Sequence, residues 1–576
     1  MMLKAGVVVS LLLLLTDSST AADKPNIILI VADDVGWYDV GFHGSDQVQT
    51  PNIDALAYSG IILNQHYVQP TCTPTRSALL AGRYPSNMGM QGIPIGGSEP
   101  RGLPPARLLP EHLKDLGYTT RMVGKWHLGF YRKELTPTYR GFDSFLGYMN
   151  GLISYYDHIY QDLIPLKPIK ESLASNRATS GKAPAISFEG GQLSGLDFFR
   201  NLTPAWDLSG RYATDVFTEE AVRIITTHDT AQPLFLYLSH LACHAGNRGK
   251  LLEAPQEVID RFPHIIEPNR KTFAAMMWKL DESVGKVVAA LRDRDMLQNS
   301  VILFISDNGA PTLPVGAWPN WGSNYPLRGL KLTQWEGGVR GVGALWSAGL
   351  GTPRVSSQLV HVTDWLPTLY RAAGGDPERL QKLDGVDQWN ALLHDKPSKR
   401  SDALLYVDEM RKVWGVRSDR WKLVGGSNQG GMFDGYSGEI GLSPKSPAYD
   451  DTAVLRSDVA KALSAVKSTM DAASLQQLRS KATVKCPEQV NRTVCDLVKN
   501  PEPCLFDIDT DPCEANNLAE SHPQEVSRLT KLYEALTVNL VPQLNAPYDV
   551  VNADPARFGN AWLPWEGTCD RDCNDI

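Results

Sequence analysis

The sequence predicts an α/β protein with a large mixed, mostly parallel sheet flanked by helices, followed by a smaller C-terminal α+β domain that contains an antiparallel sheet. Three observations support this fold class. The chain has 576 residues, more than one hydrophobic core usually organises, so we expect two domains. Short apolar runs alternate with amphipathic stretches, which is typical of a parallel sheet covered by helices. Cysteines crowd the C-terminal part, which indicates a small disulfide-stapled region there.

Three apolar runs are predicted to be strands buried on both faces, because each is continuous rather than alternating: Asn26–Val31, Leu234–Leu238 and Val301–Ile305. Between the last two, Phe273–Leu291 has apolar residues at helical spacing and predicts an amphipathic helix. Alternating strands and helices favour a largely parallel sheet. We expect this arrangement to occupy residues 23–403, the larger domain.

A second, smaller domain is predicted over residues 404–576. Its first segments, Leu404–Val407 and Trp414–Val424, suggest a short antiparallel sheet. Residues 160–210 and 425–500 are richer in Ser, Gly, Lys and Pro. We interpret both stretches as surface insertions or long loops.

Six of the eight cysteines lie in the second domain, whereas Cys72 and Cys243 stand alone. In an oxidising compartment, the six predict up to three disulfides, and their spacing leaves the connectivity open. A zinc site is disfavoured because paired CxxC spacing and accompanying histidines are lacking. The six are Cys486, Cys495, Cys504, Cys513, Cys569 and Cys573.

The first 22 residues predict a signal peptide. A charged start is followed by the apolar run Ala5–Leu15 and by small residues up to Ala22. The apolar run is far shorter than the ~20 residues that span a bilayer, so we expect no membrane anchor. Glycosylation sequons at Asn201 and Asn491 fit the same route. We therefore expect a chain in the secretory pathway that is lysosomal or extracellular.

The charge balance restricts the class of partner. Lys and Arg number 56 against 64 Asp and Glu, a formal net charge of -8. This balance argues against nucleic-acid binding, which requires a basic face. It leaves an anionic small substrate open, because a local group of cations can oppose the global sign.

Oxygen-rich side chains follow two of the predicted strands directly. Asp33 and Asp34 come after the first strand, and Asp307 and Asn308 come after the strand that ends at Ile305. Ligands of open α/β sheets collect at the carboxyl ends of strands. Three carboxylates and an amide, without thiolate or histidine, favour Ca²⁺ or Mg²⁺ over zinc. Each pair taken alone is more often a helix cap or a turn, and only the two together indicate a metal site.

The stretch from Cys72 to Arg83 begins Cys-Thr-Pro-Thr-Arg. Pro74 is suited to the first turn of a helix. Cys72 then lies at a helix N-terminus, where free amides favour negative charge. Arg76 follows one turn later on the same face. A lone cysteine is more often a buried small hydrophobe, but this pattern followed by Gly-Arg is rare.

A second motif occupies Gly117–Gly129, which reads GYTTRMVGKWHLG. Lys125 and His127 are two residues apart, so in an extended strand they project to the same side. Each alone would more often be a surface residue. Only in the context of a family resemblance do the two look like anion-binding and acid/base groups.

Both motifs resemble signatures of the sulfatase family, the first in Cys72–Arg83 and the second in Gly117–Gly129. The resemblance extends over roughly residues 26 to 565, and within the family it is greatest to arylsulfatase B (N-acetylgalactosamine 4-sulfatase) and its relatives. The other similar segments are Ala32–Trp37, Pro233–Leu238, Pro326–Gly329, Trp335–Arg340, Asp364–Thr368, Leu505–Ile508 and Asp511–Pro512.

The resemblance implies an alkaline-phosphatase-like fold whose catalytic domain is residues 23–403. It also implies that a formylglycine-generating enzyme oxidises Cys72 to formylglycine, and that one Ca²⁺ is bound. The implied calcium ligands are Asp33, Asp34, Asp307, Asn308 and the modified Cys72. The implied groups around the sulfate are Arg76, Lys125, His127, His244 and Lys331. His240 is the less favoured alternative to His244, whose following Ala245-Gly246 replaces the Glu-Pro of the relatives.

The implied activity is hydrolysis of a sulfate monoester, with a sulfated sugar such as N-acetylgalactosamine 4-sulfate as the first candidate. Aryl sulfates and sulfated glucosides stay open, as does the oligomeric state. Tyr155, Tyr156 and His158 either line the substrate pocket or pack internally. Two other classes are weighed: a phosphatase or phosphodiesterase of the same superfamily, disfavoured by Cys72 and the all-oxygen metal ligands, and a non-catalytic sulfatase-like binding protein.

Overall fold

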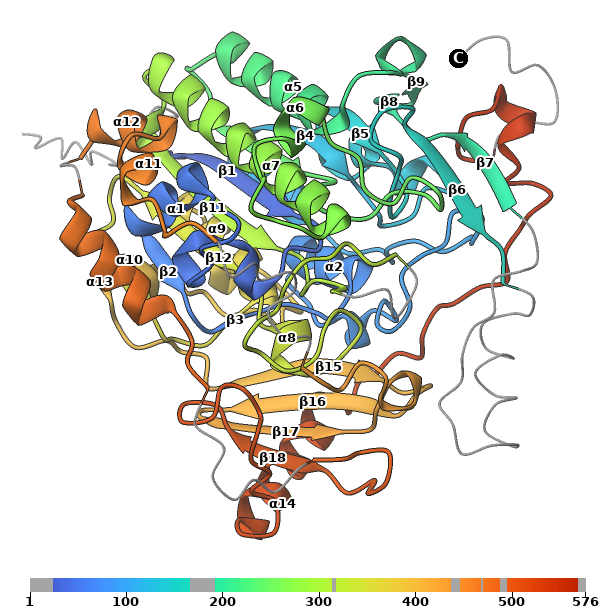
Figure 1. Ribbon diagram of the computed structural model, residues 1–576. Helices are drawn as coiled ribbons and strands as arrows, with labels where there is room; N and C mark the ends of the chain where they lie inside the picture. Colours follow the sequence, from blue (N-terminus) through green and yellow to red (C-terminus); the bar gives the residue numbers. More distant parts are fainter. Residues whose placement is uncertain are drawn as a thin grey trace, which may run out of the picture.

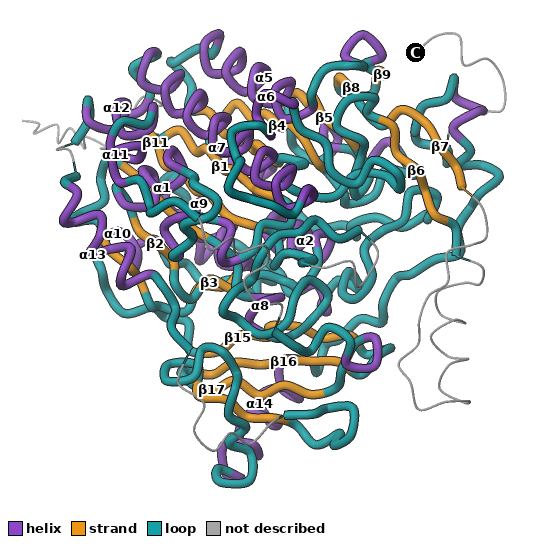
Figure 2. Tube along the Cα trace, viewed as in Figure 1, coloured by secondary structure: helices purple, strands orange, loops and turns teal. Residues whose placement is uncertain are grey.

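The computed structural model describes residues 24–165, 192–312, 318–436, 446–467, 470–486 and 495–567. The predicted signal peptide, Asn491, Cys569 and Cys573 lie outside the described residues. A large helix-flanked sheet forms most of the molecule, and a small sheet lies beside it (Figure 1). Loops gather between the two sheets (Figure 2). Within the described residues, no helix is long and apolar enough to cross a membrane.

The large sheet has ten strands in the order β13-β2-β12-β11-β1-β10-β4-β5-β8-β9. Its central strands, from β11 through β1, β10 and β4 to β5, are mutually parallel, and β12 joins β11 antiparallel. The predicted mixed, mostly parallel sheet is therefore confirmed. The strands are β1 (Asn26–Ala32), β2 (Ile61–Leu63), β4 (Thr119–Lys125), β5 (Ser144–Tyr148), β8 (Phe199–Arg200), β9 (Thr203–Pro204), β10 (Leu234–Ser239), β11 (Ser300–Ser306), β12 (Gly343–Ser347) and β13 (Arg354–Ser356).

The three predicted buried strands correspond to β1, β10 and β11. All of their residues are buried, as expected of parallel strands covered on both faces. The predicted amphipathic helix is α7, which runs from Pro268 to Asp293 and lies beside α5 over the sheet (Figure 1). The remaining helices of the large domain are α1 (Pro51–Tyr58), α2 (Cys72–Ala81), α3 (Leu109–Asp115), α5 (Ala213–Thr227), α6 (Gln256–Ile259), α8 (Glu336–Val339), α9 (Trp365–Ala372) and α10 (Trp389–His394).

The small C-terminal sheet is antiparallel, as predicted, with the order β15-β16-β17-β18. The helix α14 (Pro523–Leu536) packs on β16 and β17 and buries Leu529. Two short pairs lie outside both sheets: β3 with β14, and β6 with β7. The strands are β15 (Asp402–Asp408), β16 (Val413–Ser418), β17 (Trp421–Gly425), β18 (Cys504–Asp507), β3 (His66–Tyr67), β14 (Val360–His361), β6 (Ile159–Leu163) and β7 (Gln192–Leu196).

Residues 425–500 were predicted to be a surface insertion or a long loop, and the long-loop alternative is wrong for the middle part. Three helices form there, and they pack against α1 and α7 of the large domain. Each begins with a side-chain cap, supplied by Asp450, Ser457 and Asp471. Such caps satisfy free amides at a helix start, a local signal that the Ser- and Lys-rich composition concealed. The helices are α11 (Asp451–Leu455), α12 (Asp458–Ser464) and α13 (Ala472–Ala482).

Two disulfides join the described cysteines of the C-terminal region. Cys486 is bonded to Cys513, and Cys495 is bonded to Cys504. Cys72 and Cys243 are free and buried. The prediction of a stapled C-terminal region is confirmed for these two pairs, and the expected third pair falls on residues that are not described.

Candidate active site

The residues predicted from the two motifs and the strand ends all meet at the carboxyl edge of the large sheet. They come from the ends of β1, β4, β10 and β11, from the start of α2, and from the loop before α8. All but Lys331, at 9%, are 5% exposed or less. They are Asp33, Asp34, Cys72, Arg76, Lys125, His127, His244, Asp307, Asn308 and Lys331.

Helix α2 positions Cys72 and Arg76. The helix begins at Cys72, and Pro74 lies in its first turn. One turn later the Arg76 guanidinium donates to Asp307 Oδ2 through Nε at 3.1 Å and Nη2 at 2.7 Å. Arg76 Nη1 donates to the hydroxyl of Ser239 at the end of β10. The predicted one-turn spacing thus places a buried cation across the strand ends.

Asp33 lies between two cations. Lys125 Nζ, at the end of β4, donates to Asp33 Oδ2 at 2.6 Å, and Arg76 Nη2 lies 3.6 Å from the same oxygen. All three side chains are completely buried. A buried carboxylate requires such partners, because burial without them costs several kcal/mol.

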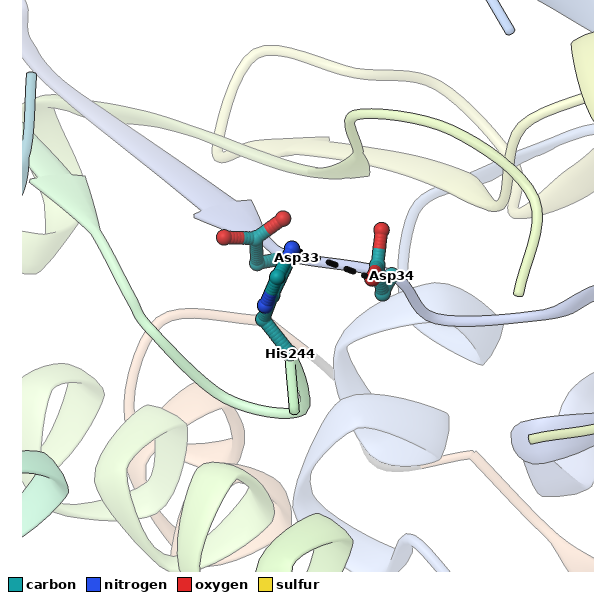
Figure 3. A group of neighbouring side chains, drawn as sticks. All are labelled: Asp33, Asp34 and His244. Carbon is teal, nitrogen blue, oxygen red and sulfur yellow. Dashed lines mark ion pairs between the residues drawn. The ribbon is translucent and has the colours of Figure 1, made fainter. Parts of the chain in front are cut away.

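Asp34 has a left-handed backbone, with φ of 60°, which turns its carboxylate toward the next strand end. Asp34 Oδ1 accepts from Asn308 Nδ2 at 2.5 Å and from Lys331 Nζ at 2.6 Å. Its other oxygen, Oδ2, lies 3.5 Å from His244 Nε2 (Figure 3). Asp307 joins the same group, since its Oδ1 accepts from the Asp34 amide at 3.2 Å.

Three buried oxygens of this group have no hydrogen-bond partner: Asp33 Oδ1, Asp34 Oδ2 and Asn308 Oδ1. Buried polar atoms are almost always bonded, so a cluster of orphaned oxygens indicates a place for a ligand. Asp33, Asp34 and His244 also each offer a ligand atom within 4.8 Å of one another. Carboxylate and amide oxygens suit a hard divalent cation. The residues therefore fit a metal ion.

His244 lies beside the carboxylates of the candidate metal site, although the sequence predicted it only as a sulfate-binding group. Its Nδ1 lies 2.6 Å from the carbonyl oxygen of Ala245. A carbonyl only accepts, so Nδ1 carries the proton in the neutral ring, and Nε2 turns its lone pair toward Asp34. Burial lowers the pKa of His244 well below its usual range. The Nε2 lone pair of His244 can therefore bind a cation as well as contact a substrate.

His127 has the opposite tautomer. Its Nε2 lies 3.1 Å from the carbonyl oxygen of Ile95, so Nε2 carries the proton. Its Nδ1 is buried and has no partner. Burial lowers the pKa of His127 well below its usual range, and the charge of Lys125 acts in the same direction. The ring is thus neutral and presents a free proton acceptor.

The Cys72 side chain lies in the field of the same charges. Burial raises the pKa of the Cys72 thiol, and although Lys125 and Lys331 act to lower it, the net shift is upward. A protonated thiol is a weak nucleophile and a weak metal ligand. The local electrostatics therefore do not activate Cys72 as a thiolate.

Several contacts of the site were not predicted. Thr75, inside the first motif, donates to the carbonyl of Asp307 at 2.6 Å. Asn320 Nδ2 donates to the carbonyls of Asp34 and Cys243, which joins the loops after β1 and β10. No local pattern marks Asn320, because its partners are distant in the chain. Thr75 could have been noticed as a hydroxyl on the first turn of the motif helix.

The alternative aromatic and histidine candidates pack internally. Tyr155 is stacked on Tyr212, and His158 is stacked on Phe198 with ring centroids 4.1 Å apart. Both are 0% exposed. Tyr156 also packs against Tyr212. His240 is buried and bonded to Ser283, with no contact to the site residues. Tyr155 and His158 are buried by packing, and the Tyr155 hydroxyl also donates to the carbonyl of His244 at 2.9 Å. Pocket lining by Tyr156 stays a prediction.

A buried, cation-rich cluster with orphaned oxygens, at the carboxyl edge of a mostly parallel sheet, is typical of an α/β enzyme that acts on an anionic ester. A family model described as Sulfatase matches residues 25–375. Arylsulfatase J of Mus musculus is 33% identical over 571 residues, covering 95% of this chain and 81% of that protein. The chain belongs to the sulfatase family, and it is a sulfuric ester hydrolase.

Other relatives point the same way. Arylsulfatase A of Homo sapiens is 33% identical, with 72% of this chain and 77% of the relative covered. N-acetylgalactosamine-6-sulfatase of Homo sapiens is 30% identical, with 66% and 68% covered. These relatives support the family and not arylsulfatase B in particular.

A solved structure supports the fold. The crystal structure of Ps i-CgsB in complex with k-i-k-neocarrahexaose matches with a TM-score of 0.66 and 25% identity, covering 93% of this chain and 98% of that one. A putative sulfatase from Bacteroides fragilis matches with a TM-score of 0.57 at 18% identity, which bears on the fold alone. The expected alkaline-phosphatase-like fold is thus confirmed.

Proposed function

We propose that this enzyme hydrolyses sulfate monoesters of sugars with a formylglycine made from Cys72 and one bound Ca²⁺. The observation that carries the proposal is the group of orphaned oxygens on Asp33, Asp34 and Asn308, set among buried cations beside Cys72. An unmodified thiol with a raised pKa would be poorly reactive there. Modification of Cys72 would supply a nucleophile where burial outweighs the cations and keeps the thiol protonated.

The cations of the pocket bind the ester and oppose the charge that grows during its cleavage. Arg76, Lys125 and Lys331 are held by carboxylates at fixed positions, so their charges need no reorganisation during the reaction. Burial acts to lower the pKa of Lys331, but Asp34 and other negative charges outweigh it and raise the pKa above its usual value. Lys331 therefore stays charged.

The two nonprotein groups supply defined chemistry. Ca²⁺, when bound by Asp33, Asp34, Asp307 and Asn308, adds positive charge beside the sulfate. The formylglycine aldehyde, when hydrated, supplies one hydroxyl to attack sulfur and a second that permits release of sulfate with return of the aldehyde. The residues around position 72 must then bind sulfate and transfer protons.

His127 is suited to accept a proton. Its free Nδ1 lone pair is fixed in direction by the bond from Nε2 to the Ile95 carbonyl. His244 and Lys331 are the most exposed members of the site, at 5% and 9%. We assign them to the side from which the ester enters, where they meet the leaving alcohol.

The proposed substrate is a sulfated sugar such as N-acetylgalactosamine 4-sulfate. The relatives include enzymes named for N-acetylgalactosamine 6-sulfate, and the similar Ps i-CgsB was solved with a neocarrahexaose. Substrate specificity depends on loops rather than on the catalytic residues that the family shares. Sugars that carry the sulfate at other positions are therefore compared with the 4-sulfate. Formylglycine formation requires passage through the secretory pathway, and we place the mature enzyme in the lysosome or outside the cell.

Peptide mass spectrometry over Cys72 of the secreted enzyme tests the central step. We expect an aldehyde mass in the native chain and its absence in the matched variant Cys72→Ser, which should lose steady-state turnover. An unmodified thiol in a fully active enzyme would overturn the formylglycine assignment.

A substrate panel tests the reaction and its specificity. Matched aryl sulfate and aryl phosphate esters separate a sulfatase from a phosphatase, and sulfate release should dominate. N-acetylgalactosamine 4-sulfate, its 6-sulfate and a sulfated glucoside then rank the sugars. Exclusive phosphate release, or binding without turnover, would contradict the proposal.

A further inference from the structure

The loop that carries Lys331 is attached to the C-terminal domain at both of its ends. This Lys331 loop, residues 328–336, belongs to the large domain, and its ends are Arg328 and Glu336. The loop contacts the disulfide-bonded segments of the C-terminal domain, at Cys495 and at Glu514. Among the described residues, none of the predicted catalytic side chains comes from the C-terminal domain, and the Lys331 loop is one of the segments that join this domain to the site.

Arg328 anchors the first end. Its guanidinium donates to three backbone carbonyls of the C-terminal domain: Asp434 at 2.7 Å, Cys495 at 2.9 Å and Glu514 at 3.3 Å. It also lies over the Trp335 ring, 3.7 Å from the centroid. The side chain is only 8% exposed. Because guanidinium is planar with several donors, one arginine can join three separate segments in a way that lysine cannot.

Glu336 anchors the second end. Its carboxylate lies 2.8 Å from Lys422 Nζ on β17, and its amide donates to Glu514 Oε2 at 2.7 Å. Lys422 also pairs with Glu514 at 2.7 Å, and all these side chains are completely buried. The end of the loop is thus fixed to the small sheet by a buried ionic group.

Between the anchors, the loop is held by its own turn and by the C-terminal segment 426–435. Leu330 and Thr333 bond to each other, and Asn428 donates to the carbonyl of Leu332. Gly329 donates to the carbonyl of Gly435 at 2.9 Å, and Leu332 donates to that of Pro70 at 2.8 Å. Lys331 itself donates from its amide to Ala310 at a longer 3.3 Å. Lys331, whose Nζ donates to Asp34, therefore lies in a loop that C-terminal segments hold at both ends and along its length.

We propose that Arg328 is a positioning residue that holds Lys331 against Asp34 by fastening its loop to the disulfide-bonded C-terminal domain. The C-terminal domain thereby contributes to turnover without entering the pocket. This inference rests on the proposed function of Lys331 in sulfate-ester cleavage. It goes beyond that function by assigning a role to a residue and a domain outside the site.

A double-mutant cycle in the full-length enzyme tests the proposal. Arg328→Lys should lower kcat roughly 10- to 100-fold, the usual range for a residue that orients a catalytic group. Lys331→Ala should lower it further. If Arg328 acts through Lys331, adding Arg328→Lys to Lys331→Ala should change kcat by less than about 2-fold. Multiplication of the two losses would overturn the proposal, because a general structural role predicts independent effects.

Arg400→Lys is the matched control. Arg400 is also 8% exposed and also donates to backbone carbonyls near the junction of the domains, at Asp384 and Asp402, but has no hydrogen bond or ion pair to the Lys331 loop. We expect it to lower thermal stability while leaving kcat within about 2-fold. An equal loss of kcat in both variants would contradict a specific role for Arg328.

A labelling measurement keeps the inference separate from the proposed function. Lys331 Nζ is sequestered by Asp34, so its acetylation by an N-hydroxysuccinimide ester, followed by peptide mass spectrometry, reports its position. Labelling should be faster in Arg328→Lys than in native enzyme or in Arg400→Lys. Absence of sulfatase activity in the native enzyme would refute the proposed function alone, whereas unchanged labelling would refute the positioning role.

Discussion

Two of the buried carboxylates that have cation partners, Asp34 and Asp364, differ in how their oxygens are used. Both are 0% exposed. Arg400 Nε donates to both oxygens of Asp364, at 2.9 and 2.8 Å. The amides of His361 and Val386 donate to the same carboxylate. Both oxygens of Asp364 therefore have several hydrogen-bond partners.

Asp34 is bonded on one oxygen only. Lys331 and Asn308 both donate to Oδ1, while Oδ2 is left without a hydrogen-bond partner. Burial and a nearby cation are common to Asp34 and Asp364, and both lie in segments that resemble sulfatases. The oxygen without a hydrogen-bond partner marks Asp34 as a ligand-binding residue, whereas the fully bonded Asp364 stabilises the fold. The predictions below test this distinction.

The largest effect is expected at the pocket. Asp34→Asn removes the charge that faces the proposed cation and pairs with Lys331, so kcat/KM should fall about 10³-fold. Stability in the absence of calcium should fall less than in Asp364→Asn, because Asp34 is bonded through one side-chain oxygen and its partner Lys331 is partly exposed. Steady-state kinetics and thermal unfolding in chelator measure the two quantities. A variant with near-native activity would break the assignment of Asp34 to the site.

The matched substitution at Asp364 should lower stability and leave activity unchanged, the opposite of what we expect at Asp34. Asp364→Asn leaves Arg400 buried without its full countercharge, and breaking a buried pair typically costs about 3–5 kcal/mol of folding stability. The kcat per folded molecule should stay native. Chemical denaturation and active-site-normalised kinetics check this. A large loss of kcat with unchanged stability would place Asp364 in the catalytic machinery instead.

Added calcium should affect the thermal stability of the Asp34 and Asp364 variants differently. A ligand present at 100 times its Kd stabilises the native state by about 2.7 kcal/mol. We expect added Ca²⁺ to raise Tm after chelation in native enzyme and in Asp364→Asn, but not in Asp34→Asn. Mg²⁺ and Zn²⁺ serve as comparison ions. A calcium response that survives in Asp34→Asn would locate the ion elsewhere.

Much of the site could be predicted from local pattern. Asp33 and Asp307 follow continuous apolar runs, and parallel strands end on one edge of a sheet, so their meeting was expected. Arg76 followed from helical spacing after Cys72. Lys331 and His244 lie in loops, where no period fixes their direction, and only the family resemblance identified them. Asn320 went unnoticed because its role arises from segments brought together by folding.

The fold was predictable to a similar degree. The continuous apolar composition of β1, β10 and β11 predicted that they are buried on both faces. The segments Leu404–Val407 and Trp414–Val424 predicted the small antiparallel sheet. The helices α11 to α13 were missed because Ser, Lys and Ala gave no strong apolar period. The disulfide pairing could not be predicted, since six cysteines allow 15 connectivities.

The smallest effect concerns a third kind of buried carboxylate, one without a cation. Asp197 accepts from the amides of Met149 and Asn150 at 2.8 and 2.9 Å. Burial raises its pKa from 3.8 to about 7, and the amides offset this only in part. The folded protein thus holds the proton more tightly than the unfolded chain. The resulting stability is complete below about pH 4 and is lost as the pH rises through 7.

Asp197→Asn should therefore flatten part of the fall in stability between pH 5 and pH 8, by about 2 kcal/mol. Denaturation at several pH values in chelator measures the slope without a contribution from calcium. A conservative control is Asp207→Asn, at an exposed carboxylate, which should leave the slope unchanged. If Asp197→Asn kept the native slope, amide donors alone would suffice to hold a buried carboxylate ionised. The contrast with Asp364 would then reflect geometry rather than charge.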